Sequence, residues 1–138
     1  PMDVLRLPGY SWFIQFEPSK GWGCTTQNGQ LWFEERENFL PLLPLLEQPW
    51  PEASALVTSA CQSAQVEAEF PFEQVVLAAL AWPTEGWPSL ALAWFAQGFP
   101  VSSTARQELA ALSQNKAMPQ RLRHQAFAYS KARSASEA

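Results

Sequence analysis

The sequence predicts a mostly α-helical α+β fold: a short N-terminal antiparallel β-meander followed by about five antiparallel helices. Two observations support this prediction. Before residue 36, two segments are rich in the aromatic and β-branched residues that favour strands. After residue 37, apolar residues recur at helical spacing, and prolines divide the chain into segments of 10–14 residues, the usual length of single helices.

Three strands make up the expected meander. They span Tyr10–Glu17, Trp22–Thr26 and Gln30–Glu35. The run Pro18-Ser19-Lys20-Gly21 predicts the first turn. The dipeptide Asn28-Gly29 predicts a type I′ hairpin, because both central positions of that turn need a positive φ. This turn would place Thr25 opposite Trp32.

Aromatic side chains occur on both faces of this meander. One face would hold Trp12, Ile14, Phe16 and Trp32, and the other Phe13, Trp22, Leu31 and Phe33. At least one face must therefore pack against the rest of the protein, and the sequence leaves open which one.

Four of the expected helices begin at a proline, which is tolerated in the first turn of a helix. They are Pro51–Ala64, Pro71–Trp82, Pro88–Gln97 and Pro119–Ala132. A fifth helix is expected over about Ser103–Asn115, where Thr104 and Gln107 have the spacing of a capping box. The segment 38–47 is apolar but contains two prolines, so it predicts a broken helix or an extended wrap.

Short connections between these helices predict antiparallel hairpins. Phe70-Pro71 recurs as Phe99-Pro100 after 29 residues, a period that suits a HEAT-like stack, although a plain bundle is the alternative. We expect one domain over 1–138, made of the meander (10–35), the helical array (38–133) and a frayed tail (134–138).

The cellular context follows from what the sequence contains. Cys24 and Cys61 have 36 residues between them and no neighbouring ligand, so we expect two free thiols rather than a disulfide framework or a zinc site. The first residues do not resemble a signal peptide, and the apolar runs are too short to span a membrane. The expectation is a soluble, cytoplasmic protein.

Catalytic residue types are scarce. His124 is the only histidine and Asp3 the only aspartate, and a Ser-His-Asp triad would need both, with the aspartate buried. No phosphate-binding loop and no cluster of metal ligands is evident. We therefore expect a protein that is not an enzyme and that uses no cofactor or metal.

Charge is distributed unevenly along the chain. Residues 1–105 hold three Lys or Arg against eleven Asp or Glu (−8), whereas residues 106–138 hold six against two (+4). Much of this positive charge lies on the last helix, on the side opposite its apolar residues. The candidate partner-binding residues are Arg121, Arg123, His124 and Lys131, together with Trp22, because surplus tryptophan favours interfaces.

The expected function is that of a non-catalytic protein–protein interaction module, such as a bacterial adaptor or an immunity- or antitoxin-like protein. Its partner would be another protein with an acidic surface. The few cations and the acidic body argue against nucleic acid. An ordinary solvated helix face is the alternative interpretation of the basic residues. Two other functions stay open: an enzyme or small-ligand binder with a Trp-lined pocket between the meander and the helices, and a structural subunit that forms homodimers or larger oligomers through the sheet.

Overall fold

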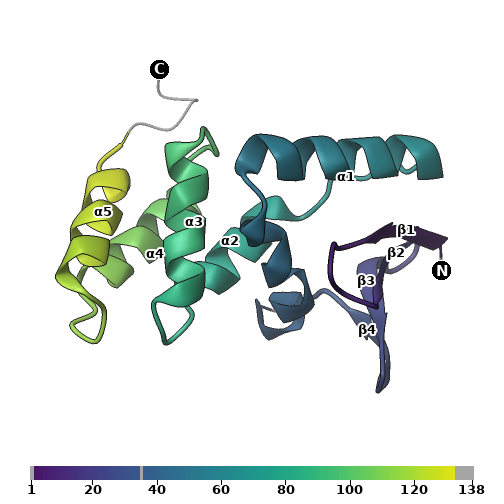
Figure 1. The fold of residues 1–138 in the computed structure, drawn as a ribbon, viewed down its shortest axis with the longest axis horizontal. Helices are drawn as coiled ribbons and strands as arrows, with labels where there is room; N and C mark the ends of the chain where they lie inside the picture. Colours follow the sequence, from purple (N-terminus) through teal and green to yellow (C-terminus); the bar gives the residue numbers. More distant parts are fainter. Residues whose placement is uncertain (1, 35, 133–138) are drawn as a thin grey trace.

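A four-stranded antiparallel sheet lies at one end of the molecule, and the helices extend from it to the other end (Figure 1). The computed structural model describes residues 2–34 and 36–132, so the expected tail at 134–138 lies outside the described residues. The strands follow one another in sequence order: β1 Met2–Arg6, β2 Phe13–Glu17, β3 Gly21–Thr26 and β4 Gly29–Trp32. The predicted fold class, a meander followed by helices, is confirmed.

The first strand was not predicted. β1 pairs with β2, with Met2 opposite Phe16 and Arg6 opposite Phe13, and its register shifts between Asp3 and Leu5. This irregularity and the two charged residues hide the alternation by which a strand is usually recognised in a sequence. β1 also contacts helix α1, so it joins the sheet to the helical part.

The predicted hairpin register is wrong. Thr25 lies opposite Gln30, not Trp32. The reason is the turn, whose central residues are Gln27 and Asn28, with the positive φ of 108° at Gly29. A turn followed by a left-handed glycine is a common alternative to the type I′ hairpin.

The predicted faces of the sheet are also wrong. Ile14 lies opposite Cys24, one residue from the expected pairing, and a slip of one residue moves a strand's side chains to the other face. Trp22 and Leu31 therefore share a face with Ile14, and it is this face that packs on the helices. Trp32 lies on the outer face.

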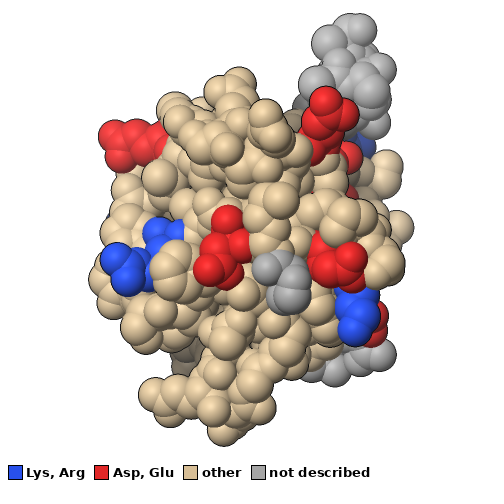
Figure 2. All heavy atoms as spheres, turned by 90° about the vertical axis from the view of Figure 1, so that its right-hand side faces the viewer, with Lys and Arg blue, Asp and Glu red and all other residues tan. Residues whose placement is uncertain are grey.

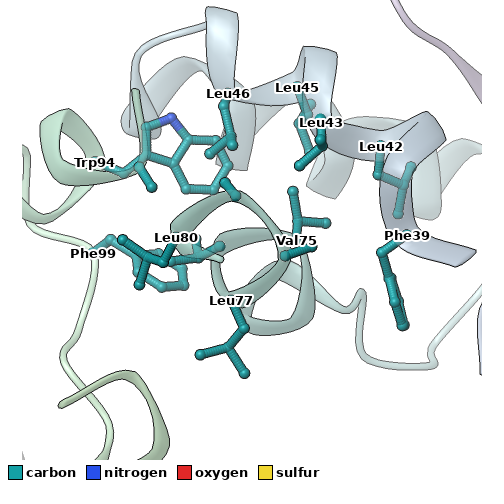
Figure 3. Packing of buried hydrophobic residues seen from close by; sticks show 14 of the residues in the cluster. Phe39, Leu42, Leu43, Leu45, Leu46, Val75, Leu77, Leu80, Trp94 and Phe99 are labelled. Atoms are coloured by element: carbon teal, nitrogen blue, oxygen red, sulfur yellow. The ribbon is translucent and has the colours of Figure 1, made fainter. Parts of the chain in front are cut away.

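The segment after the sheet forms a 3-10 helix, η1 (Arg36–Glu47), although it contains Pro41 and Pro44. The φ angle of proline fits this geometry. Five apolar side chains of η1 are buried in the core that η1 shares with α2, where Leu43 lies next to Val75 (Figure 3). They are Phe39, Leu42, Leu43, Leu45 and Leu46. The segment expected to be a broken helix or an extended wrap is thus a 3-10 helix, and it forms part of the core.

Five α-helices follow, each within two residues of its expected bounds. They are α1 Trp50–Ala64, α2 Phe72–Leu80, α3 Gly86–Ala96, α4 Ser103–Ser113 and α5 Gln120–Ser130. The predicted capping box at Thr104 and Gln107 is wrong. Ser102 caps α4 instead, since its hydroxyl oxygen accepts a hydrogen bond from the Ala105 N–H at 3.1 Å.

Helices α2 and α3 form one hairpin, and α4 and α5 form the next. α2 also contacts α4, and α3 contacts α5, so the second hairpin stacks on the first (Figure 1). This is how arrays of helical pairs bury the apolar side of each pair. A single hydrophobic cluster runs from Leu5 in β1 to Ala126 in α5 and includes Trp94, which is 1% exposed. None of the described helices has the length and apolar character needed to cross a membrane.

Candidate functional site

Helix α5 lies at the end of the molecule farthest from the sheet (Figure 1). Its exposed residues include basic side chains. Arg121, His124 and Lys131 are exposed, whereas Leu122 and Ala126 are buried against the array. The predicted division of this helix into a basic and an apolar side is therefore present in the structure. We call the exposed side, formed by Arg121, His124, Phe127 and Lys131, the α5 face.

Phe127 is the functional candidate that the sequence analysis did not identify. Its side chain is 52% exposed, and the Lys131 ammonium nitrogen lies 5.4 Å from the centre of its ring. His124, Phe127 and Lys131 are three and four residues apart, which places them on one side of the helix. The exposure of Phe127 could have been predicted from the sequence. Consecutive helical residues point about 100° apart, so the residue directly after the buried Ala126 points away from the core.

The other two basic positions differ in their surroundings. Arg123 is half-buried, and its Nε donates a hydrogen bond to the Met118 carbonyl at 3.2 Å, so it stabilises the turn between α4 and α5. Arg121 borders a hollow of about 400 Å³ between α3 and α5, which Glu85 and Tyr129 also line. Arg121 therefore belongs to the α5 face, while Arg123 lies at its inner edge.

Trp22 lies in the core, on the buried face of the sheet and far along the molecule from α5. It is 7% exposed, and its ring packs 5.0 Å from both Phe16 and Phe70, measured between ring centres. Its indole N–H donates to the Glu69 carbonyl at 2.9 Å. Trp22 thus joins the sheet to the segment between α1 and α2 through ring packing and a hydrogen bond, and it offers little surface to a partner.

A groove of about 860 Å³ opens where α1, α2 and α4 begin. We call it the aromatic groove. Its lining residues are Trp50, Glu69, Phe70, Pro71, Phe72, Glu73, Gln74, Phe99, Pro100, Val101 and Ser102. The Trp50 ring meets Phe72 and Phe99 edge to face, at 4.9 and 4.8 Å between ring centres. Both copies of the recurring Phe-Pro pair, Phe70-Pro71 and Phe99-Pro100, line the groove. The repeat seen in the sequence therefore also marks the position of the groove.

Polar groups at this groove are acidic or neutral. Glu69 is exposed, and the half-buried Glu73 accepts a hydrogen bond from the Ser102 hydroxyl. The Trp50 backbone N–H donates to the Gln97 side-chain oxygen at 2.6 Å. Neither Lys, Arg nor His occurs among the described lining residues.

A smaller hollow lies between the sheet and η1, where the sequence analysis placed a Trp-lined pocket. It has a volume of about 670 Å³, and Trp12, Thr25 and Leu40 are among its lining residues. The buried indole N–H of Trp12 has no hydrogen-bond partner among the described groups. The aromatic groove is larger and lies elsewhere, at the beginnings of three helices.

Both cysteines are free thiols, as predicted. Burial raises the pKa of the Cys24 thiol to about 11 and also raises the pKa of Cys61. A thiol held in its neutral form is a poor nucleophile and a poor metal ligand. Across residues 2–34 and 36–132, His, Cys, Asp and Glu do not gather in groups of three that could hold a metal ion.

Comparisons with protein-family models, with curated proteins and with solved structures found no match to this chain. A functional assignment therefore depends on the α5 face and the aromatic groove.

Proposed function

We propose that the protein is a non-catalytic interaction module that binds an acidic protein through the α5 face. The observation that favours this function is Phe127, an aromatic side chain 52% exposed and adjacent to Lys131 on a basic helix. Protein interfaces commonly combine an aromatic anchor with a charged rim, in which the anchor provides most of the binding energy.

The charges around Phe127 would select the partner. Arg121 and Lys131 are exposed, and exposed charges mainly steer association and exclude partners of the same sign. The acidic remainder of the chain disfavours nucleic acid, whose phosphates it would repel. We place the protein among small cytoplasmic adaptors or bacterial immunity- or antitoxin-like proteins, which act by covering a surface of another protein.

A capture experiment with three variants tests this proposal. The immobilised protein is incubated with lysate of the source cells, and retained proteins are identified by mass spectrometry. Phe127→Ala and the double variant Arg121→Glu/Lys131→Glu should lose the partner, and the parent should release it as salt rises, because exposed charges are screened over about 8 Å at physiological ionic strength. Lys116→Glu is the matched control, since it changes an exposed cation in the turn before α5.

Melting curves separate lost binding from lost folding. All three variants change exposed residues, so their melting temperatures should stay close to that of the parent. Equal partner recovery by the parent, Phe127→Ala and the double variant would show that the α5 face is an ordinary solvated surface.

A second candidate function is self-association through the sheet. Phe13 on the outer face is 40% exposed, and Met2 at the edge of the sheet is 48% exposed. Figure 2 shows that charged residues on this end of the molecule are few and scattered. Such a surface suits contact with a second copy. Sedimentation analysis tests it: a parent dimer that Phe13→Asp converts to a monomer would support this function, and a monomeric parent would exclude it.

A further inference from the structure

We propose that the aromatic groove is a second recognition site, which takes a basic peptide segment and holds a Lys or Arg side chain between its rings and the carboxylates of Glu69 and Glu73. This inference does not depend on the α5 face. The two sites have opposite charge and would recognise different partners.

The walls of the groove suit a cation. Lys and Arg are attracted to the faces of aromatic rings, most strongly to tryptophan. Trp50 contributes such a ring, and its edge-to-face contacts with Phe72 and Phe99 hold it in place before a ligand arrives. Preorganised side chains lose less conformational entropy on binding. Pro71 and Pro100 add rigid apolar surface on either side.

The charge of the groove also favours a cation over an anion. Helix N-termini attract anions, and three helices begin here. Each already has a protein group at its first turn: Gln97 accepts from the Trp50 N–H of α1, Glu73 lies in the first turn of α2, and Ser102 caps α4. An incoming anion would instead meet Glu69 and Glu73, whereas a cation would meet these two carboxylates and no Lys, Arg or His among the described lining residues.

The size of the groove indicates a peptide rather than a free ion. Its volume of about 860 Å³ lies within the range of roughly 300–1,000 Å³ that is typical of pockets for drug-sized ligands. That space accepts a long side chain together with the backbone on both sides of it. Gln74, which is exposed at the border, offers a side-chain amide for this backbone.

Selection from a library of short random peptides displayed on phage tests the proposal on the intact protein. Enriched peptides should contain more Lys and Arg than the starting library. Synthetic copies should bind Glu69→Lys roughly three- to tenfold more weakly than the parent, because an exposed attractive pair becomes a repulsive one. Glu67→Lys is the matched control: it is also exposed and two residues away, but it does not line the groove, so its affinity should stay within about twofold of the parent's.

NMR of the indole N–H groups locates the bound peptide. The Trp50 signal should shift on titration with an enriched peptide, and the signal of Trp32, on the outer face of the sheet, should not. The proposal is overturned if no peptide is enriched, if enriched peptides are neutral or acidic, or if they bind Glu69→Lys as tightly as the parent. Concentration-dependent self-association that Glu69→Lys abolishes would also overturn it, because the occupant would then be a second copy. None of these variants alters the α5 face, so the two proposals succeed or fail separately.

Discussion

Replacing Trp94 by alanine tests whether the aromatic cluster that Trp94 forms with Trp50 and Phe99 stabilises the fold. Trp94 is 1% exposed, and the ring centres of Trp50 and Phe99 lie 5.1 and 5.6 Å from its own. Its indole N–H donates to the Gln48 carbonyl at 2.9 Å, which joins α3 to the segment between η1 and α1. Truncating a large buried aromatic residue costs about 3–5 kcal/mol of unfolding free energy. The loss of the hydrogen bond, which leaves a carbonyl unpaired, favours the upper half of that range.

Urea unfolding followed by far-UV circular dichroism measures this cost. A domain of this size has about 5–15 kcal/mol of stability, so Trp94→Ala should remain folded but unfold at a much lower urea concentration. Trp94→Phe keeps a ring and loses the hydrogen bond, and it should lie between the parent and the alanine variant. Trp32→Ala, at a half-buried position on the outer face of the sheet, is the control and should cost clearly less than Trp94→Ala. If Trp94→Ala were no less stable than Trp32→Ala, the packing described here would be wrong.

Three further predictions concern single positions. Gly23→Ala should destabilise the protein by about 1–3 kcal/mol, because the added Cβ would lie 2.6 Å from the Trp32 ring. Gly86→Ala is the control in the same denaturant assay: its added Cβ would have no atom within 4 Å, so it should be neutral or stabilising. Ser102→Ala should cost about 0.5–2 kcal/mol by removing the cap of α4, and hydrogen exchange should quicken first at the beginning of that helix. The raised pKa of Cys24 means that the folded protein keeps a proton that the unfolded chain loses, so stability should fall as pH rises from about 9 to about 11, and Cys24→Ala should reduce that slope in unfolding curves recorded against pH.

The sequence predicted helices better than strands, for a physical reason. Prolines and the 3.6-residue repeat act locally, so the bounds of α1 and α5 were close. Strand register depends instead on which residues turn the chain. The Asn28-Gly29 dipeptide suggested one turn, whereas the structure uses Gln27 and Asn28 with a left-handed Gly29. That difference, with the slip between β2 and β3, placed Trp22 on the wrong face of the sheet.

The candidate sites show the same difference between local and long-range information. The residues of the α5 face belong to one helix, and their spacing in the sequence is enough to place them on one side of it. Its cations were predicted in this way, and Phe127 could have been predicted in the same way. The aromatic groove could not, because it combines residues from three helix beginnings. Glu69 and Ser102 are 33 residues apart in the sequence, and only the packing of the two hairpins brings their segments together.

The position of the aromatic groove also decides how it can be tested. Trp50 lines the groove, but its ring also packs 5.1 Å from the buried Trp94, so the rings that would bind a cation belong to the core. A substitution at Trp50 would weaken folding and binding together, and neither effect could be measured alone. Glu73 has the same difficulty, because it accepts a hydrogen bond from the residue that caps α4. Glu69 is exposed, and only its backbone carbonyl is used by Trp22. Its carboxylate can therefore be reversed while the fold is kept, which makes charge reversal at this residue the change that isolates recognition from stability.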